Sequence, residues 1–169
     1  MIKFRTIGSF SNVATFPDIR AHVDMPNYRA VEVNHISKDT AWATATTPKE
    51  NLCIVMQEFW NRTGDLFFGD RMLRPGDHLL CVGLESLATR FLDIGATHIV
   101  GSLDATGALT VTPGDALIPD GNGDWVVAAA IPTSGIYLHV TGVTTLPKYG
   151  TGGNGGMTEP AVTAQIISV

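Results

Sequence analysis

The chain has 169 residues, a formal net charge of −5 and 44% hydrophobic residues, whereas only 16% of its residues are charged. Val, Ile and Thr number 14, 12 and 19, but Lys and Glu only 4 and 5, and β-branched side chains favour strands over helices. This composition excludes helical bundles and coiled coils, and it predicts a single all-β domain in which part of the charge-poor surface is covered by a partner chain.

Residues 1–27 carry apolar side chains at every third position, separated mostly by small polar residues. The six positions are Phe4, Ile7, Phe10, Val13, Phe16 and Ile19. A period of three fits neither a helix nor a regular strand, and it suits an extended, polyproline-II-like segment with one apolar edge. One interpretation is an interaction arm, residues 1–27, laid across a neighbouring subunit. The other is an irregular first strand that packs on the chain's own core.

Residues 28–169 show strand patterns in quick succession. Residues 30–36 alternate apolar and polar side chains, as a half-buried strand does. Residues 52–60 form a continuous apolar run after Thr47-Pro48-Lys49-Glu50, a capping-box sequence that predicts a short helical turn feeding a buried strand. The apolar spacing from residue 84 to residue 92 favours a short helix or turn before a strand. Two further strands are predicted at residues 135–143 and 161–169.

Turn signals separate these strands. The phrase Pro-Gly-Asp occurs at residues 75–77 and again at residues 113–115, each time before an apolar run. Proline presets the second position of a type II turn and glycine supplies the positive φ of the third, so each phrase predicts such a turn leading into a strand. Residues 120–124 predict a hairpin tip between two strands. The expected architecture is an antiparallel β-sandwich, jelly-roll-like, or a β-barrel, over residues 28–169.

Two motifs resemble ligand sites. Asp120, Asn122 and Asp124 copy the first half of a calcium loop, but Trp125 and Ile131 stand where an EF-hand has Gly and Glu. A hairpin tip is therefore expected, and the three residues remain a metal-site candidate. Residues 150–155 match G-x-G-x-x-G, but no helix follows to meet a pyrophosphate, so a loop is expected there.

No enzyme and no cofactor is predicted. The five histidines lack metal-ligand spacing, and no nucleophile-elbow sequence is present. Cys53 and Cys81 lie in apolar runs and are expected to be reduced core residues. No basic cluster is present to follow a phosphate backbone, and no apolar run is long enough to span a membrane. Neither nucleic acid nor a membrane is therefore an expected partner. A sugar-stacking platform would need exposed aromatic side chains; the candidates are Trp42, Trp60, Trp125, Tyr137 and Tyr149.

The second half of the chain resembles a family of phage proteins. The phrases that carry the resemblance are Gly76-Asp77-His78-Leu79-Leu80-Cys81-Val82, Phe91-Leu92-Asp93-Ile94-Gly95, Gly101-Ser102-Leu103-Asp104-Ala105-Thr106-Gly107 and Gly135-Ile136-Tyr137-Leu138-His139-Val140. Their order, with the strand at the end of the chain, is similar to the head decoration (cement) proteins of tailed bacteriophages and to related small virion proteins. The resemblance covers residues 64–169. The Gly-rich stretch at residues 150–156 and the long segment before the first strand depart from the family's pattern.

The resemblance implies a jelly-roll-like or β-barrel domain, often trimeric, on the outer surface of a phage capsid. The implied partners are the major capsid protein and further copies of the chain. The implied location is the virion, after synthesis in the host cytoplasm, because no signal-peptide core follows Met1. Two alternatives remain: a tail-tube or head–tail adaptor subunit, and a carbohydrate- or receptor-binding β module.

Overall fold

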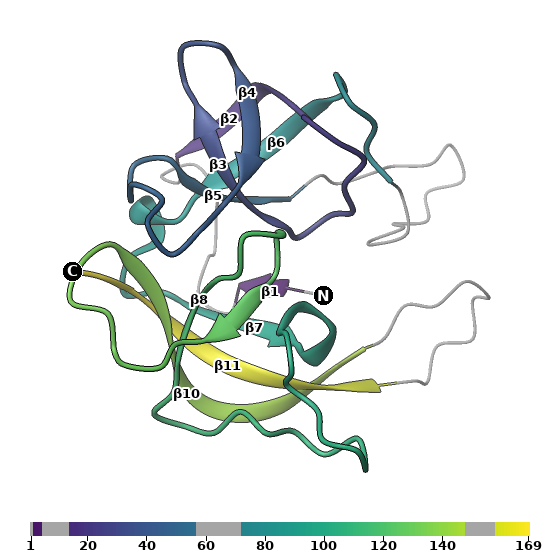
Figure 1. The fold of residues 1–169 in the computed structure, drawn as a ribbon, viewed down its shortest axis with the longest axis vertical. Coiled ribbons are helices and arrows are strands. Elements are labelled where there is room, and N and C mark those ends of the chain that lie inside the picture. The colour runs from purple at the N-terminus through teal and green to yellow at the C-terminus, as the bar shows by residue number, and fades with distance from the viewer. Residues whose placement is uncertain (1, 5–13, 57–71, 148–157) are drawn as a thin grey trace.

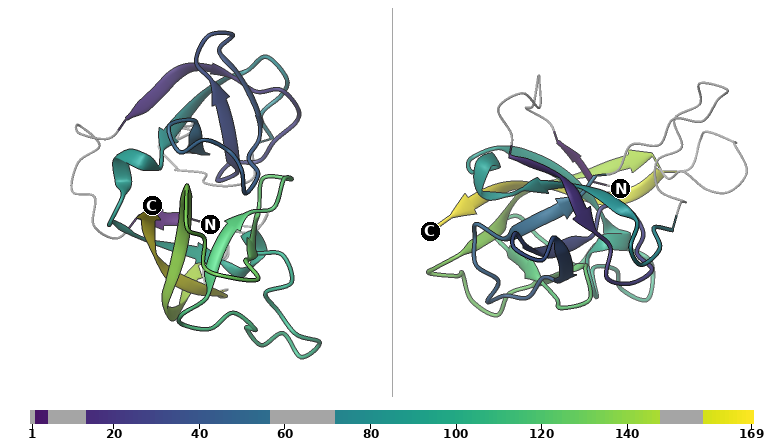
Figure 2. Two further views of the ribbon diagram at one scale, coloured as in Figure 1. Left: turned by 60° about the vertical axis from the view of Figure 1, so that its left-hand side comes forward. Right: turned by 90° about the horizontal axis from the view of Figure 1, so that it is seen from above.

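The computed structural model describes residues 2–4, 14–56, 72–147 and 158–169, and it is built from two β-sheets stacked one above the other (Figures 1 and 2). The upper body is a closed five-stranded barrel in the order β2-β4-β3-β5-β6, and the lower body is a six-stranded sheet in the order β1-β7-β11-β10-β8-β9, here called the lower sheet. The all-β prediction is confirmed. No helix among the described residues is long and apolar enough to cross a membrane.

The barrel takes its strands from the first half of the chain: β2 (Thr15–Arg20), β3 (Ala30–Asn34), β4 (Asp39–Trp42), β5 (Leu52–Val55) and β6 (His78–Gly83). The lower sheet takes five of its six strands from the second half: β1 (Ile2–Phe4), β7 (Phe91–Gly95), β8 (Ala116–Pro119), β9 (Trp125–Val127), β10 (Ile136–Pro147) and β11 (Thr158–Ser168). Two short 3-10 helices, η2 (Glu85–Leu87) and η3 (Ala96–His98), flank β7. The strands predicted at residues 30–36, 135–143 and 161–169 are therefore present, as is a short helix before the strand at residues 91–95.

Two apolar cores hold these sheets. The barrel core fills the barrel interior and includes Ile19, Val33, Cys53, Leu79 and Cys81. The shared core lies between the two bodies and joins barrel residues to residues of the lower sheet. Because neighbouring residues of a strand point to opposite faces, β5 contributes Cys53 and Val55 to the first core and Leu52 and Ile54 to the second. This double burial explains the unbroken apolar run that begins at Leu52.

The arm interpretation of residues 1–27 does not hold for the described part of that segment. β1 pairs with β7, where Ile2 lies opposite Ile94 and Phe4 opposite Leu92. β2 pairs with β6, and Ile19 is only 1% exposed. These residues follow the alternative, a strand packed on the chain's own core. Ile7, Phe10 and Val13 lie outside the described residues.

A β-bulge explains the spacing of three between Phe16 and Ile19. Phe16 lies opposite Cys81 and Ile19 opposite Leu79, so three steps along β2 match two steps along β6. The extra residue lets both side chains face the barrel core, although regular strand residues three apart point to opposite faces. The boundary predicted at residue 28 therefore cuts through the barrel.

The two Pro-Gly-Asp phrases form matching turns. In the first, Asp77 N donates to Arg74 O, Gly76 has φ +86°, and the Asp77 carboxylate accepts a bond from Arg74 N. In the second, Asp115 N donates to Thr112 O, Gly114 has φ +103°, and the Asp115 carboxylate accepts from Thr112 N. The first turn leads into β6 of the barrel and the second into β8 of the lower sheet. The turn prediction is confirmed in both bodies.

The turn before β5 differs in detail from the capping box expected at Thr47. A single turn closes where Asn51 N donates to Pro48 O, 3.0 Å away. Thr47 does not cap it: Thr47 Oγ1 accepts a bond from Thr44 N, upstream, and donates to a Glu32 carboxylate oxygen at 3.0 Å. The short turn is present, but the threonine instead ties the loop to β3.

Candidate functional site

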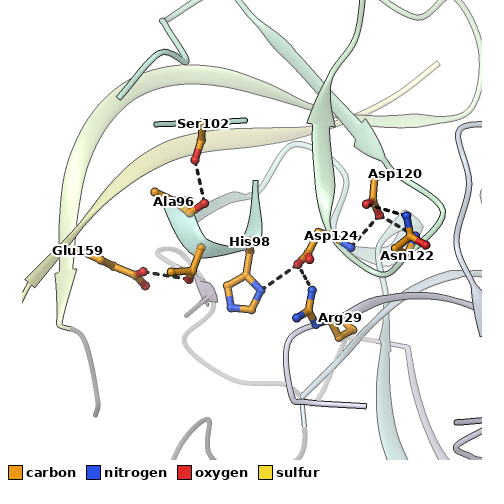
Figure 3. Close-up of polar contacts among 9 residues, drawn as sticks. Arg29, Ala96, His98, Ser102, Asp120, Asn122, Asp124 and Glu159 are labelled. Carbon is orange, nitrogen blue, oxygen red and sulfur yellow. Dashed lines mark hydrogen bonds and ion pairs between the residues drawn. The ribbon is translucent and has the colours of Figure 1, made fainter. Parts of the chain in front are cut away.

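The hairpin tip at residues 120–124 is closed by its own aspartate. Asp120 Oδ1 accepts bonds from Asn122 N at 2.8 Å and Asp124 N at 3.0 Å, and Asn122 Nδ2 donates to Asp120 Oδ2 (Figure 3). Gly121 and Gly123 adopt φ values of +88° and +93°, which suit glycine far better than other residues. The Asp, Asn and Gly residues of this motif therefore build a tight turn between β8 and β9, as predicted.

The same tip fastens the lower sheet to the barrel. Gly121 N donates to Ala43 O at 3.1 Å, and Ala30 N donates to Gly123 O at 2.8 Å. A Cβ atom on Gly123 would lie 2.7 Å from the Trp42 ring, closer than real Cβ contacts come. Gly123 is therefore required for its backbone conformation and for this close approach. We call residues 120–124 the inter-sheet clip.

Asp124 extends the clip with charge. Its carboxylate pairs with the Arg29 guanidinium, which precedes β3, and lies 3.4 Å from His98 Nδ1 on η3 (Figure 3). The Arg29 and Asp124 side chains are each 21% exposed and His98 is 12% exposed, so the group is largely shielded from water. The Tyr28 ring stands edge-on to the His98 ring, with centroids 6.2 Å apart. Three elements far apart in the sequence thus meet where the two bodies touch.

The electrostatics of this group favour an ion pair beside a neutral histidine. Burial lowers the pKa of His98, and its contact with Asp124 offsets that shift only in part. Burial on its own would raise the pKa of Asp124, but the contacts with His98 and Arg29 outweigh it and leave the pKa below its usual value. At neutral pH, Asp124 is therefore anionic and paired with Arg29, and His98 is uncharged. This arrangement joins the barrel to the lower sheet through an ion pair, and it does not set up any of the three side chains as a nucleophile.

The carboxylates of the metal-site candidate are directed at partners within the protein, which a calcium loop would not do. The structure brings Asp120, Asn122 and Asp124 together, but the Asp120 carboxylate accepts bonds from its own turn and the Asp124 carboxylate faces Arg29 and His98. Calcium requires six to eight oxygen ligands. In the part of the chain that the structure describes, no group of three or more His, Cys, Asp or Glu residues is arranged to hold a metal ion.

The two cysteines are interior residues, as predicted. Cys53 and Cys81 are free thiols with 0% exposure in the barrel core. Burial raises the pKa of both thiols, that of Cys81 to about 12, so neither forms a thiolate at neutral pH. Neither thiol has the exposed, electropositive setting that a nucleophile needs.

The described members of the aromatic set do not form an exposed platform. Trp125 is fully buried in the shared core, Tyr137 is 8% exposed, and Trp42 packs against the barrel core beside Gly123. Trp60 and Tyr149 lie outside the described residues, as does the glycine-rich stretch at residues 150–155.

Two buried carboxylates lie on the face of the lower sheet that points away from the shared core. Asp93 Oδ1 accepts a bond from Thr163 Oγ1 at 2.8 Å. Glu159 accepts one from Thr97 Oγ1 at 2.9 Å, and this second contact is drawn in Figure 3. Gly95 makes room for the second, because a Cβ there would lie 2.0 Å from a Glu159 oxygen. Both carboxylates therefore belong to the packing of β11 against β7 and the adjoining η3.

Sequence reasoning singled out Asp124 but missed its partners Arg29 and His98. Nothing in the local sequence marks them, because Arg29 lies in a barrel loop and His98 in a 3-10 helix, almost 70 residues apart. The comparisons add no further guide: no protein-family model matches the chain, and searches of curated proteins and of solved structures find no match.

Proposed function

We propose that this chain is a virion structural protein that binds the outer surface of a tailed-phage capsid and stabilises the head lattice, as an oligomer and most simply as a trimer. The observation that carries the proposal is the ordered set of phrases that resembles head decoration proteins. In the structure these phrases form β6 of the barrel, β7 and β10 of the lower sheet, and the turn that Asp104 closes between β7 and β8. They are followed by the terminal strand β11.

The physical character of the chain supports this role. A decoration protein needs a rigid body with surface to spare for contacts, and it needs neither a reactive centre nor a basic groove. Here the clip and the shared core join the two bodies, and the described carboxylates and thiols that are buried serve packing. Repetition over a lattice makes many weak contacts effective together, because binding at one site raises the effective concentration at the next.

The direct test is binding to expanded, undecorated phage heads. Purified full-length protein is mixed with the heads, and the pellet after sedimentation is analysed for bound chain. Saturable binding at a fixed ratio to the capsid subunits, with heads that better resist heat or low salt, is the expected result. An absence of saturable binding contradicts the proposal. Rings of the free protein in electron micrographs would instead favour the tail-tube or adaptor alternative.

A further inference from the structure

The inter-sheet clip places an asparagine directly before a glycine. Asn122 is exposed at the tip, whereas Gly123 is buried against the barrel. Asn-Gly is the dipeptide most prone to spontaneous deamidation, because glycine has no Cβ to keep its own backbone nitrogen away from the asparagine side chain. The close approach to the Trp42 ring disfavours any larger residue at position 123, so the fold itself keeps this reactive dipeptide in the clip.

The backbone nitrogen of Gly123 is not held in the turn. Among the described residues, none accepts a hydrogen bond from Gly123 N, whereas the N–H groups on either side, those of Asn122 and Asp124, both donate to Asp120 Oδ1 (Figure 3). The Asn122 side chain is restrained by one long bond, from its Nδ2 to Asp120 Oδ2 at 3.3 Å. No hydrogen bond within the described part of the protein therefore has to break before Gly123 N can react.

Asn34 is an exposed asparagine in a different setting. Its Oδ1 accepts bonds from Ile36 N at 2.9 Å and from Ser37 N at 3.0 Å. The residue that follows it is His35, whose side chain hinders attack by the backbone nitrogen. Asn34 therefore serves as a matched asparagine that is expected to remain intact.

We infer that Asn122 is a site of spontaneous modification, at which the clip deamidates in the folded chain and the joint between the barrel and the lower sheet loosens with time. Gly123 N gives up its proton to a base in solution and attacks Asn122 Cγ. The new N–Cγ bond forms, the Cγ–Nδ2 bond breaks, and the amide nitrogen leaves as ammonia. The resulting five-membered imide takes up one water molecule and opens to aspartate or to isoaspartate. Water is the only co-reactant, and nothing is oxidised or reduced.

Either product disturbs the contact that the clip makes. In aspartate, a charged oxygen replaces the Asn122 Nδ2 group that donates to Asp120, so a hydrogen bond becomes a repulsion between two carboxylates. In isoaspartate, the main chain also gains one carbon between Gly121 and Gly123. Gly121 N and Gly123 O are the two backbone groups that bond the barrel, so their spacing no longer matches their partners.

Peptide mapping of the folded, full-length protein after incubation in mildly alkaline buffer tests the modification. Trypsin releases residues 91–148 as one peptide, because no Lys or Arg occurs before residue 148, and Asn122 is the only Asn or Gln in it. Asn34 lies in a separate tryptic peptide, residues 30–38. We expect the first peptide to gain the mass of deamidation and to become a substrate for a protein-isoaspartate methyltransferase, with the second unchanged.

Two results of this mapping would overturn the inference. One is an Asn122 peptide that stays unmodified in the folded protein while the same peptide deamidates in denaturant. The other is a rate that rises in Ile19→Ala, because this core truncation enlarges the unfolded population and would place the reaction in the unfolded chain. An equal rate in wild type and Ile19→Ala is the expected result.

Thermal unfolding tests the loosening. Asn122→Asp copies one product, and Asn34→Asp is its matched control, because the Asn34 side chain makes its turn bonds only as an acceptor. We expect a lower unfolding midpoint for Asn122→Asp and for incubated wild type, and no change for Asn34→Asp. Asn122→Ser lacks the reactive amide and should keep its midpoint through the same incubation. If incubated wild type loses no more stability than Asn122→Ser, the modified clip holds as well as the original and the inferred loosening is wrong.

Discussion

The barrel half and the lower-sheet half of this chain differ sharply in charge. Residues 1–90 contain ten basic and ten acidic residues, whereas residues 91–169 contain one basic and six acidic residues. The whole formal charge of −5 therefore belongs to the second half. From Trp125 to Pro147 there are 23 consecutive residues without Asp, Glu, Lys or Arg. The low charge content that marks the composition is thus a property of one region.

The two regions also use their apolar residues differently. In the barrel, β5 is buried on both faces, so its apolar run is fully accounted for inside the protein. In the lower sheet, one face packs on the shared core, whereas Val100, which directly follows the shared-core residue Ile99, is 50% exposed. Apolar runs in this sequence therefore do not all have one structural cause: some are buried on both faces of a strand, and others leave apolar side chains at the surface.

The largest expected effect separates a core strand from a surface arm. Ile19→Ala should lower the free energy of unfolding by about 2–5 kcal/mol, because Ile19 is 1% exposed in the barrel core and truncation leaves a cavity. Ile36→Ala is the control, since Ile36 is 95% exposed and such surface changes stay within about 0.5 kcal/mol. Urea unfolding followed by circular dichroism measures both. Equal stabilities would mean that β2 does not belong to the barrel in solution.

Local patterns in the sequence were enough to predict much of this fold. The alternation of β3, the two Pro-Gly turns and the strand at the end of the chain depend on neighbours a few residues apart. The period of three left two interpretations open, an arm and an irregular first strand, and the sequence could not decide between them because a bulge depends on the partner strand, and β6 lies some 60 residues away. The group of Arg29, His98 and Asp124 was missed for the same reason, since only the packing of the two bodies brings those side chains together.

The inter-sheet clip offers a second way to test how the two bodies depend on each other. Gly123→Ala should destabilise the protein by about 2–4 kcal/mol, because it adds left-handed backbone strain and a Cβ that meets the Trp42 ring. Gly107→Ala is the control: its φ is +82° and nothing lies within 4 Å of the new Cβ, so strain alone should cost about 1 kcal/mol. Thermal unfolding measures the difference. Matching losses would show that the clip's close approach has no energetic weight.

A smaller effect is expected from pH at the contact between the bodies. Burial lowers the pKa of His98 in the folded chain, so the unfolded chain binds more protons as pH falls below about 6.5. Stability should therefore be complete above that pH, decline as pH falls from about 6.5 toward the lower folded-state pKa, and level off below it. Burial also lowers the pKa of His22 in the barrel, which adds a loss of the same sign.

Substitution separates these two histidines. His98→Asn should remove the part of the decline in stability between pH 7 and pH 5 that arises at the inter-sheet contact. His22→Asn should remove only the part that arises in the barrel. The free energy of unfolding is measured by urea titration at each pH. A wild-type protein that gains stability on acidification through this range would contradict the sign derived for both groups.

The smallest perturbation is a thiol probe that distinguishes opening of the barrel from opening of the whole protein. Cys53 and Cys81 are fully buried, and burial raises the pKa of Cys81 to about 12, so a disulfide reagent should label neither thiol in the folded chain and both in denaturant. Because β5 and β6 face both cores, the barrel should open only when the shared core opens. The labelling rate should then report the same free energy as global unfolding. Labelling that responds to Ile19→Ala but not to Gly123→Ala would show instead that the barrel opens independently of the lower sheet.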